Sequence, residues 1–341
     1  MSSLTTRLPP PVRRRLGRYK RALLHRAGLM PIPTGQAPRP EAPVAVANSA
    51  VRTPAWKPTP AERLQLRRDS VFATADRAGR LLEIGAAHNG ILPKREGFNT
   101  KIVDYLDRDG LVHKYSTFEQ YSADDIEEVD FVLSSGAALT DVIHEQFDLV
   151  LASHVLEHTT CLITFLNDAT RLLADGGVLA LVVPDHRYCF DRFRERSALG
   201  RVIDTQQNPP KVHTVGTLTE FSLNAVRHRG TTSWVDGHAG RYSLVHTLGE
   251  VRRNAEKATS GEYVDVHNWI FSPHHLRLLL DDLHTLGLIQ LREAHFRETV
   301  GHEFFLNLTV DGPGTGLSRE QLLVLADAEL TSLDLPEFET V

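Results

Sequence analysis

Two acidic residues at the ends of short apolar runs are the first candidates for chemistry in this sequence. Glu83 lies inside the run LLEIGAAHNG, residues 81–90, and a glycine follows shortly after it. A carboxylate in a buried strand needs a partner, and glycine after the strand allows a sharp turn and the close approach of a ligand. Asp104 follows roughly twenty residues later, at the end of KIVDY, where an acid can accept hydrogen bonds from ribose hydroxyls.

The turn after Glu83 departs from the glycine fingerprint of dinucleotide-binding sites. That fingerprint is G-x-G-x-x-G, with a helix N-terminus facing the pyrophosphate. Gly85 and Gly90 fit it, but Ala87 occupies the place of the middle glycine. The missing glycine and the acid before the turn disfavour a pyrophosphate and favour a cationic amino-acid ligand. A nicotinamide dehydrogenase is therefore a poor interpretation.

Histidines near the ends of later strands are candidate general bases, because imidazole titrates near neutral pH. His154 and His158 follow the apolar run FDLVLAS, and His186 follows a run that ends at Pro184. His267 lies at the end of a long irregular segment, beside a tryptophan that could stack on a sugar or fill core. The same segment holds two further histidines, and two acids that could orient a ring: His228, His238, Asp236 and Asp265.

The run HVLEH, residues 154–158, matches the H-x-x-E-H signature of inverted zinc proteases. That signature needs a helix that brings both imidazoles to one face, whereas here a strand ends at Ser153 and the next helix starts several residues later. Zinc proteolysis is therefore disfavoured. We expect no metal; a divalent ion held by His154, Glu157 and His158, polarising a substrate oxygen, is the weaker alternative.

Alternating strands and helices must position these residues. The apolar runs predict strands at 81–84, 101–105, 129–133, 147–152, 178–183, 287–291 and 302–310, and helices at 162–173 and 273–286. Near-continuous apolar strands separated by helices favour a parallel sheet that is covered on both faces. Ligands of such α/β sheets bind beyond the carboxyl ends of the strands. We therefore expect the site at that edge.

Four elements in this order resemble the class I S-adenosylmethionine-dependent methyltransferases. They are LLEIGAAHNG, KIVDYLD, FDLVLASHVLEH and LLADGGVLALVVPD, and the resemblance covers about residues 78–310. It implies a Rossmann-like α/β fold with a seven-stranded, mostly parallel sheet whose last strand is antiparallel. The runs PDHRYCFDRFR and DVHNWIFSPHHLRLLLDDL are similar to methyltransferases of bacterial polysaccharide biosynthesis.

The resemblance implies S-adenosylmethionine as cofactor and gives a role to each cofactor-binding residue. The methionine end of the cofactor would contact Glu83, Gly85, Ala86, Ser153 and His154, the ribose diol Asp104, and the adenine Ser134. Ser134 departs from the acid that many relatives carry there. Because a sugar hydroxyl is a poor nucleophile at neutral pH, a histidine base is also expected. The candidates for this base are His158, His186, His154 and His267.

The expected reaction is O-methylation of a carbohydrate or glycan intermediate. It is an SN2 transfer in which the protein aligns hydroxyl, methyl carbon and sulfur and excludes water. Two alternatives stay open. The first is a small phenolic or natural-product acceptor on the same fold. The second is a non-catalytic binding module in a polysaccharide-biosynthesis complex.

The charge pattern predicts a basic, proline-rich arm before the enzyme domain. Eleven Lys and Arg residues stand against one acid in the first 60 residues. We predict an arm (1–60, partly disordered), a methyltransferase domain (61–312) with a lid insertion (about 185–268), and a helical tail (313–341). Glycosyltransferases or an anionic membrane surface are candidate partners of the arm, whereas nucleic acid is disfavoured because only Tyr19 interleaves with the arginines. A homo-oligomer stays open.

Composition also bounds the compartment. No run approaches the ~18 consecutive apolar residues of a membrane span. The two cysteines, Cys161 and Cys189, suggest no disulfide framework and fit a reducing compartment. We expect a cytoplasmic protein, with peripheral association at the inner membrane surface as an extension of that expectation.

Overall fold

A computed structural model describes residues 58–116, 122–134, 137–235, 237–331 and 337–338. The chain divides into two units, Met1–Val51 and Arg52–Val341, and all the elements below belong to the second. The basic arm predicted at 1–60 lies almost entirely outside the described residues, as does Asp236. In the part of the chain that is described, no helix combines the length and apolar character needed to cross a membrane.

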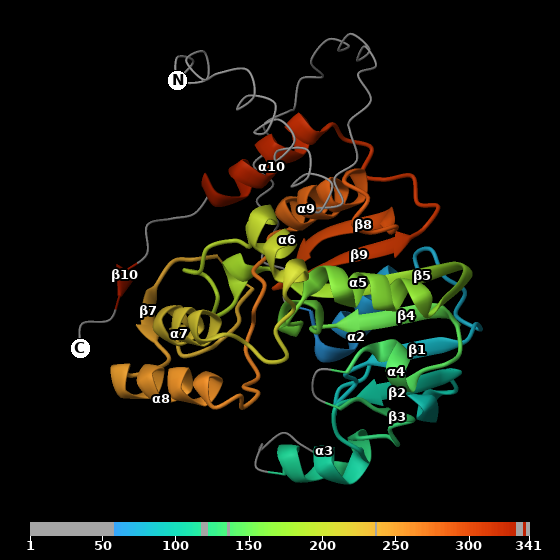
Figure 1. Cartoon of the computed structure of the whole chain (residues 1–341), viewed down its shortest axis with the longest axis horizontal. Helices are drawn as coiled ribbons and strands as arrows, with labels where there is room; N and C mark the ends of the chain where they lie inside the picture. Colours follow the sequence, from blue (N-terminus) through green and yellow to red (C-terminus); the bar gives the residue numbers. More distant parts are fainter. Residues whose placement is uncertain (1–57, 117–121, 135–136, 236, 332–336, 339–341) are drawn as a thin grey trace, which may run out of the picture. The chain divides into compact units, whose positions relative to one another are not determined.

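Seven strands form one sheet in the order β3-β2-β1-β4-β5-β9-β8 (Figure 1). Their bounds are β1 Leu81–Ile84, β2 Thr100–Asp104, β3 Phe131–Val132, β4 Phe147–Ser153, β5 Leu173–Pro184, β8 Arg292–Val300 and β9 Glu303–Thr309. The first five pair in parallel, and β9 runs antiparallel between β5 and β8. The Rossmann-like sheet with an antiparallel last strand is therefore confirmed.

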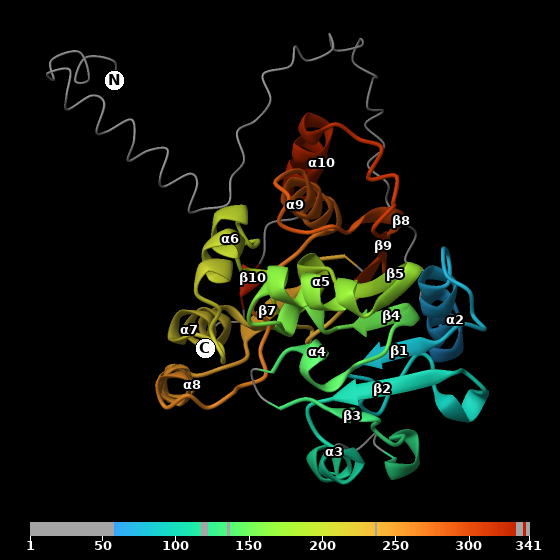
Figure 2. The same ribbon diagram turned by 45° about the vertical axis from the view of Figure 1, so that its right-hand side comes forward.

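The central strands are apolar on both faces, which explains why helices cover both faces of the sheet. Val150 and Ala152 of β4 share one apolar cluster with helices α5 and α9, and Leu149 and Leu151 share another with α2. Successive side chains of a strand point to opposite faces, so a strand that is apolar throughout is buried on both. Figure 2 shows α5 and α9 on one side of the sheet and α2 on the other. These helices span α2 Pro60–Val71, α5 Leu162–Arg171 and α9 Pro273–Thr285.

One predicted strand is wrong. Residues 287–291 follow α9 as turn and coil, and β8 begins only at Arg292. Ile289 and Leu291 are apolar because they fill the core beside the sheet. β8 is an edge strand, half-buried along most of its length, so it carries charged residues and lacks an apolar run.

A group of elements between β5 and α9 lies beside the large sheet (Figure 1). It contains α6 Leu199–Gln207, α7 Val215–Asn224, β6 Val226–His228, β7 Arg241–Leu244 and α8 Leu248–Thr259. A second sheet has the order β10-β7-β6, with β10 at Glu337–Phe338. The elements from α6 to α8 occupy the stretch that the sequence predicts to be a lid, and the lid itself stays a prediction.

The remaining elements are short or peripheral. They are α3 Arg108–Tyr115, α4 Leu139–Val142, α10 Arg319–Thr331, and the 3-10 turns η2 Lys94–Glu96, η3 Ala123–Asp125, η4 Leu156–His158 and η5 His186–Tyr188. Helix α10 lies on α9, where Glu329 accepts hydrogen bonds from the His274 N–H at 2.7 Å and the Ser272 hydroxyl at 2.5 Å. Two of the 3-10 turns, η4 and η5, follow the carboxyl ends of β4 and β5 and bring polar residues to that edge.

Candidate active site

Glu83 closes the turn that follows β1. Its carboxylate accepts hydrogen bonds from the backbone N–H groups of Ile91 at 2.7 Å and Leu92 at 2.9 Å. Burial outweighs these hydrogen bonds and raises the pKa of Glu83 to about 6. Gly85 has a φ of 67°, and an added Cβ would lie 3.3 Å from Cγ2 of Val155. The turn therefore needs glycine here, and Glu83 acts on it through the backbone.

Two non-glycine residues beside this turn adopt the left-handed conformation. Ala87, in the place of the middle glycine, has a φ of 47°, and His154, directly after β4, has a φ of 52°. Such backbone strain costs about 1 kcal/mol or more per residue and concentrates at functional sites. Ala86, between Gly85 and Ala87 in the turn, is buried. Adjacent strand ends thus both carry strained backbone.

Asp104 stands at the end of β2 and is only 6% exposed. Its Oδ1 accepts the Tyr105 N–H at 2.7 Å, and burial raises the pKa of its carboxyl group. The exposed Ser134 follows β3, next to Leu133, whose N–H donates to the Asp104 carbonyl at 2.8 Å. Neither Glu83 nor Asp104 is turned toward bulk solvent. Buried carboxylates and a close backbone turn at one sheet edge fit a nucleoside cofactor with an amino-acid tail.

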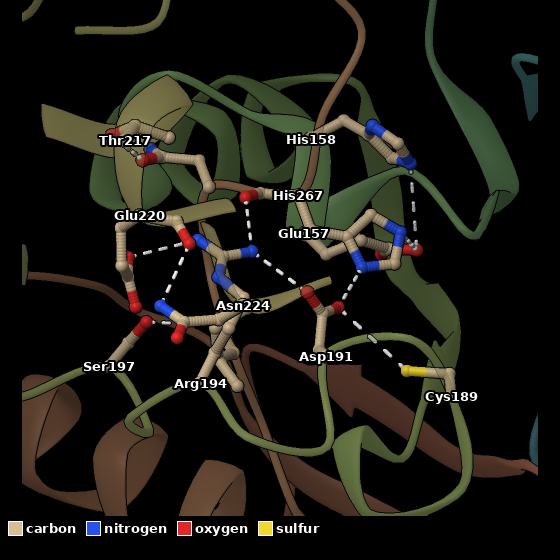
Figure 3. Close-up of polar contacts among 12 residues, drawn as sticks. Glu157, His158, Cys189, Asp191, Arg194, Ser197, Thr217, Glu220, Asn224 and His267 are labelled. Atoms are coloured by element: carbon tan, nitrogen blue, oxygen red, sulfur yellow. Dashed lines mark hydrogen bonds and ion pairs between the residues drawn. The ribbon is translucent and has the colours of Figure 1, made fainter. Parts of the chain in front are cut away.

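Three histidine rings surround one oxygen of Glu157 in the loop after β4. Glu157 is fully buried, and neither carboxylate oxygen has a hydrogen-bond partner among the described residues. Its Oε1 lies 3.6 Å from Nδ1 of His154, 3.9 Å from Nε2 of His158 and 3.8 Å from Nε2 of His267. Figure 3 shows Glu157 close to the rings of His158 and His267. The structure thus brings three of the four predicted histidines together; we call Glu157, His154, His158 and His267 the Glu157 group.

Backbone contacts hold this group together across a long stretch of sequence. The carbonyl oxygen of Glu157 accepts the N–H groups of Asn268 at 2.7 Å and Trp269 at 3.0 Å. The Trp269 indole donates to the Thr159 carbonyl at 2.6 Å, and its side chain is 1% exposed, so it fills core and does not stack on a sugar. The segment that returns from the insertion is therefore joined to the loop after β4.

The second nitrogen of each ring contacts a different carboxylate. His154 Nε2 lies 2.8 Å from Glu303 Oε1, and His158 Nδ1 lies 2.9 Å from Asp265 Oδ1. His267 Nδ1 hydrogen-bonds Oδ2 of the buried Asp191. A carboxylate on one ring nitrogen sets the orientation and tautomer of an imidazole. The other nitrogen of each ring faces Glu157.

The charges around these pairs shift their protonation. Burial lowers the pKa of His158, but the contact with Asp265 and the nearby Glu157 outweigh it, so the pKa is raised. Asp265 has its own pKa lowered, chiefly by His158. Burial opposes ionisation of Asp191, yet His267 and Arg194 lower its pKa to about 2. A proton placed on His158 is therefore stabilised by two flanking acids.

The fourth predicted base, His186, lies apart from the Glu157 group. It is 4% exposed, and neither ring nitrogen has a hydrogen-bond partner among the residues that the structure describes. Burial lowers its pKa to about 4, so the ring is neutral at pH 7. In the insertion, His228 and His238 pack against aromatic rings, including that of Trp234. These three histidines are not brought to the reacting centre.

Two acids of the site escaped sequence reasoning. Asp191 lies within the run CFDRF, and Glu303 begins β9, where it pairs with Arg67 of α2. Each contacts its histidine across a sequence separation of 76 residues (Asp191) or 149 residues (Glu303). The sequence around each acid gives no sign of its histidine partner, so only the packing of distant segments identifies these pairs.

The alternative metal set is divided between two groups. Ligand atoms of Glu157, His158 and His267 lie within 4.8 Å of one another, and so do those of His154, His302 and Glu303. Glu303 already forms an ion pair with the Arg67 guanidinium, which disfavours a second cation there. The other group has the donor types of a zinc site. His267, which sequence analysis did not include in the metal set, takes the place of His154.

One family model and several solved structures are similar to this chain. A family model described as a methyltransferase domain matches residues 59–283. Among solved structures, the chain is similar to the PH0226 protein from Pyrococcus horikoshii OT3, with 10% identity, a TM-score of 0.38, and coverage of 72% of this chain and 89% of that one. It is also similar to the CcbJ methyltransferase from Streptomyces caelestis, with 12% identity, a TM-score of 0.37, and coverage of 71% and 88%.

A third similar structure is that of the glycopeptide N-methyltransferase MtfA, with 10% identity, a TM-score of 0.36, and coverage of 72% of this chain and 89% of that one. No curated protein sequence matches the chain. At such identities and TM-scores the solved structures do not indicate an acceptor. The family match extends over most of the described residues, and this chain therefore belongs to the methyltransferase-domain family, whose membership implies S-adenosylmethionine as the methyl donor.

Proposed function

We propose that this protein transfers the methyl group of S-adenosylmethionine to a hydroxyl of a carbohydrate or glycan intermediate, with His158 as general base. The observation that carries the proposal is the position of His158 between Asp265 and the buried Glu157, just after the carboxyl end of β4. Its side chain is 27% exposed, so an acceptor can reach the ring. His267 is only 8% exposed and is held by Asp191, and His154 is held by Glu303.

The cofactor would lie across the carboxyl ends of β1, β2 and β4. Asp104 would accept hydrogen bonds from the ribose diol, and Ser134 would lie near the adenine. The methionine part would contact the backbone at Gly85, Ala86, Ser153 and His154, over a turn that Glu83 holds through two N–H groups. The bound cofactor supplies a sulfonium methyl that is already activated for transfer.

His158 would take the proton from the acceptor hydroxyl as the new carbon–oxygen bond forms. Nδ1 is on Asp265, so Nε2 is the nitrogen that accepts the proton. The resulting imidazolium lies between Asp265 and Glu157, whose charges stabilise it. The proton lost by the hydroxyl would thus end on His158, and the electrons of the broken carbon–sulfur bond would stay with the departing sulfur, so charge would balance.

Polar surroundings support a hydroxylated acceptor over an apolar phenol. The ammonium of Lys114 lies 3.5 Å from Oδ2 of Asp265, and Asp265 itself is half exposed. A narrow apolar slot, which a phenol would favour, would not place this ion pair beside the base. We also propose that the basic arm associates with glycosyltransferases or an anionic inner-membrane surface, which would place the enzyme near growing glycans.

Calorimetry with S-adenosylhomocysteine tests the cofactor half of the proposal. We expect micromolar binding that Asp104→Ala weakens at least about tenfold, because the ribose loses its acceptor. Asp109→Ala, on the exposed face of α3, is the matched control and should bind normally. Binding that Asp104→Ala leaves untouched would contradict the proposed cofactor site.

Methyl transfer to polysaccharide-derived glycans tests the reaction half. With labelled S-adenosylmethionine, we expect label in an alkali-stable methyl ether. His158→Ala should lower kcat by about a hundredfold or more while S-adenosylhomocysteine binding persists. Label found in a phenol or in an amine would show that the acceptor is not a carbohydrate hydroxyl. Cofactor binding without any turnover would favour a non-catalytic binding module.

A further inference from the structure

A cavity of about 390 Å³ lies between the start of α6, with the chain before it, and the first two turns of α7. Its wall includes Glu195, Arg196, Arg201, Gly216, Thr217 and Glu220. No member of the Glu157 group lines it. The reaction proposed above leaves this cavity without a role.

The wall combines donors and acceptors and carries no net charge. Two guanidinium groups, of Arg196 and Arg201, and two carboxylates, of Glu195 and Glu220, line the cavity. A phosphate or sulfate would lose as much from the carboxylates as it gains from the arginines. A neutral ligand with many hydroxyl groups can donate to the carboxylates and accept from the guanidinium groups. The wall chemistry thus favours a sugar over an anion.

Other contacts hold the two arginines in place before any ligand binds. Arg201 lies 4.7 Å from the centre of the Trp269 ring and donates to the Asn268 carbonyl at 3.0 Å. Arg196 donates to the Ala326 carbonyl at 2.6 Å and the Ser272 hydroxyl at 3.1 Å. Guanidinium groups held in this way lose little side-chain entropy on binding.

The cavity and the Glu157 group share structural residues. The Thr217 hydroxyl donates to Oδ1 of Asn268 at 3.0 Å, and the Asn268 N–H donates to the Glu157 carbonyl at 2.7 Å. On a second route, Glu220 contacts Arg194 at 3.1 Å, and Arg194 contacts Asp191 at 2.8 Å, which holds His267 (Figure 3). A ligand in the cavity would therefore be fixed relative to the base.

We propose that this cavity is an acceptor subsite that binds a neutral glycosyl unit other than the unit that receives the methyl group. The proposal rests on the proposed function, since it assigns a second binding position to the same glycan. An acceptor held at two positions loses its orientational freedom before the reaction. The subsite would select oligosaccharides over monosaccharides.

Blocking the cavity tests the proposal. A Cβ added at Gly216 meets only Oγ1 of Thr214, at 3.8 Å, so Gly216→Phe fills the space without removing a hydrogen bond. Gly200→Phe is the matched control, because Gly200 lies in the first turn of neighbouring α6, is exposed, and does not line the cavity. The probes are neutral methyl glycosides, neutral disaccharides and inorganic phosphate. The binding of each sugar is measured by saturation-transfer NMR in the absence of cofactor, and the binding of phosphate by its displacement of a bound sugar.

We expect a neutral disaccharide to bind the unmodified protein and Gly200→Phe alike, and to lose at least about tenfold in affinity with Gly216→Phe. Phosphate that binds instead, and is displaced by Gly216→Phe, would overturn the assignment to a neutral sugar. Absence of any sugar binding, or equal loss in both variants, would overturn the subsite. S-adenosylhomocysteine binding by all three proteins separates this outcome from failure of the proposed function.

Discussion

His158 experiences opposing effects, and their balance decides how the enzyme should respond to pH. Burial lowers its pKa, while the Asp265 contact and Glu157 raise it, with a net rise. A general base works when deprotonated, so kcat/KM should fall as the pH drops through this raised pKa. In Asp265→Asn the main raising contact is lost, so we expect the inflection of the kcat/KM profile to move to lower pH.

The control for this pH experiment is Asp282→Asn, which removes a carboxylate from the Arg319 pair between α9 and α10, away from the Glu157 group. It should leave the inflection where it is. An inflection that Asp265→Asn does not move would show that His158 is not the group whose titration limits the reaction. Folding of both variants is checked by circular dichroism.

Glu157 is a buried carboxylate that has no hydrogen-bond partner among the described residues, and such burial is costly. Either three imidazoles offset its charge, or a cation binds with His158 and His267. We predict that the purified protein holds no stoichiometric divalent metal by elemental analysis and keeps its kcat after dialysis against a chelator. One zinc per chain that is lost in His267→Ala would reverse this, since a metal-bound imidazole cannot act as the base.

At the scale of elements, the turn after β1 is shaped by its left-handed residues. Ala87 has a φ of 47°, which glycine adopts without strain. We predict that Ala87→Gly raises the free energy of unfolding by about 0.5–1 kcal/mol, since relief of strain exceeds the added entropy of the unfolded chain. Thermal and urea unfolding measure the change. Ala86→Gly, at a buried neighbour without positive φ, should lower the stability.

The elements also show what the sequence could and could not predict. Strands β1, β4 and β5 are buried on both faces, so their apolar runs were sufficient, and Glu83 and Asp104 could be placed at their sheet edge. The edge strand β8 was missed because half-exposed positions tolerate charge. The histidines after β4 were found from their position alone. Their partners Asp191 and Glu303 were not, because contacts between distant segments leave no local pattern.

At the scale of the whole molecule, charge is divided unequally along the chain. Eleven basic residues and one acid give residues 1–60 a net charge of +10, so residues 61–341 carry −15 within the total of −5. An anionic surface would attract the first segment and repel the rest. The arm would therefore tether the enzyme domain to such a surface without drawing the domain itself onto it.

We predict that the full chain sediments with vesicles that contain anionic lipid at low salt, and that binding falls as salt screens the attraction. Each basic residue near such a surface contributes about 1 kcal/mol, so replacing Arg13, Arg14 and Arg15 with alanine should weaken binding by roughly a hundredfold. The matched control replaces the exposed Arg252, Arg253 and Lys257 of α8, which removes the same charge from the enzyme domain. Equal losses of vesicle binding in both variants would mean that net charge, and not the arm, governs association. Vesicle binding that salt does not weaken would rule out an electrostatic tether.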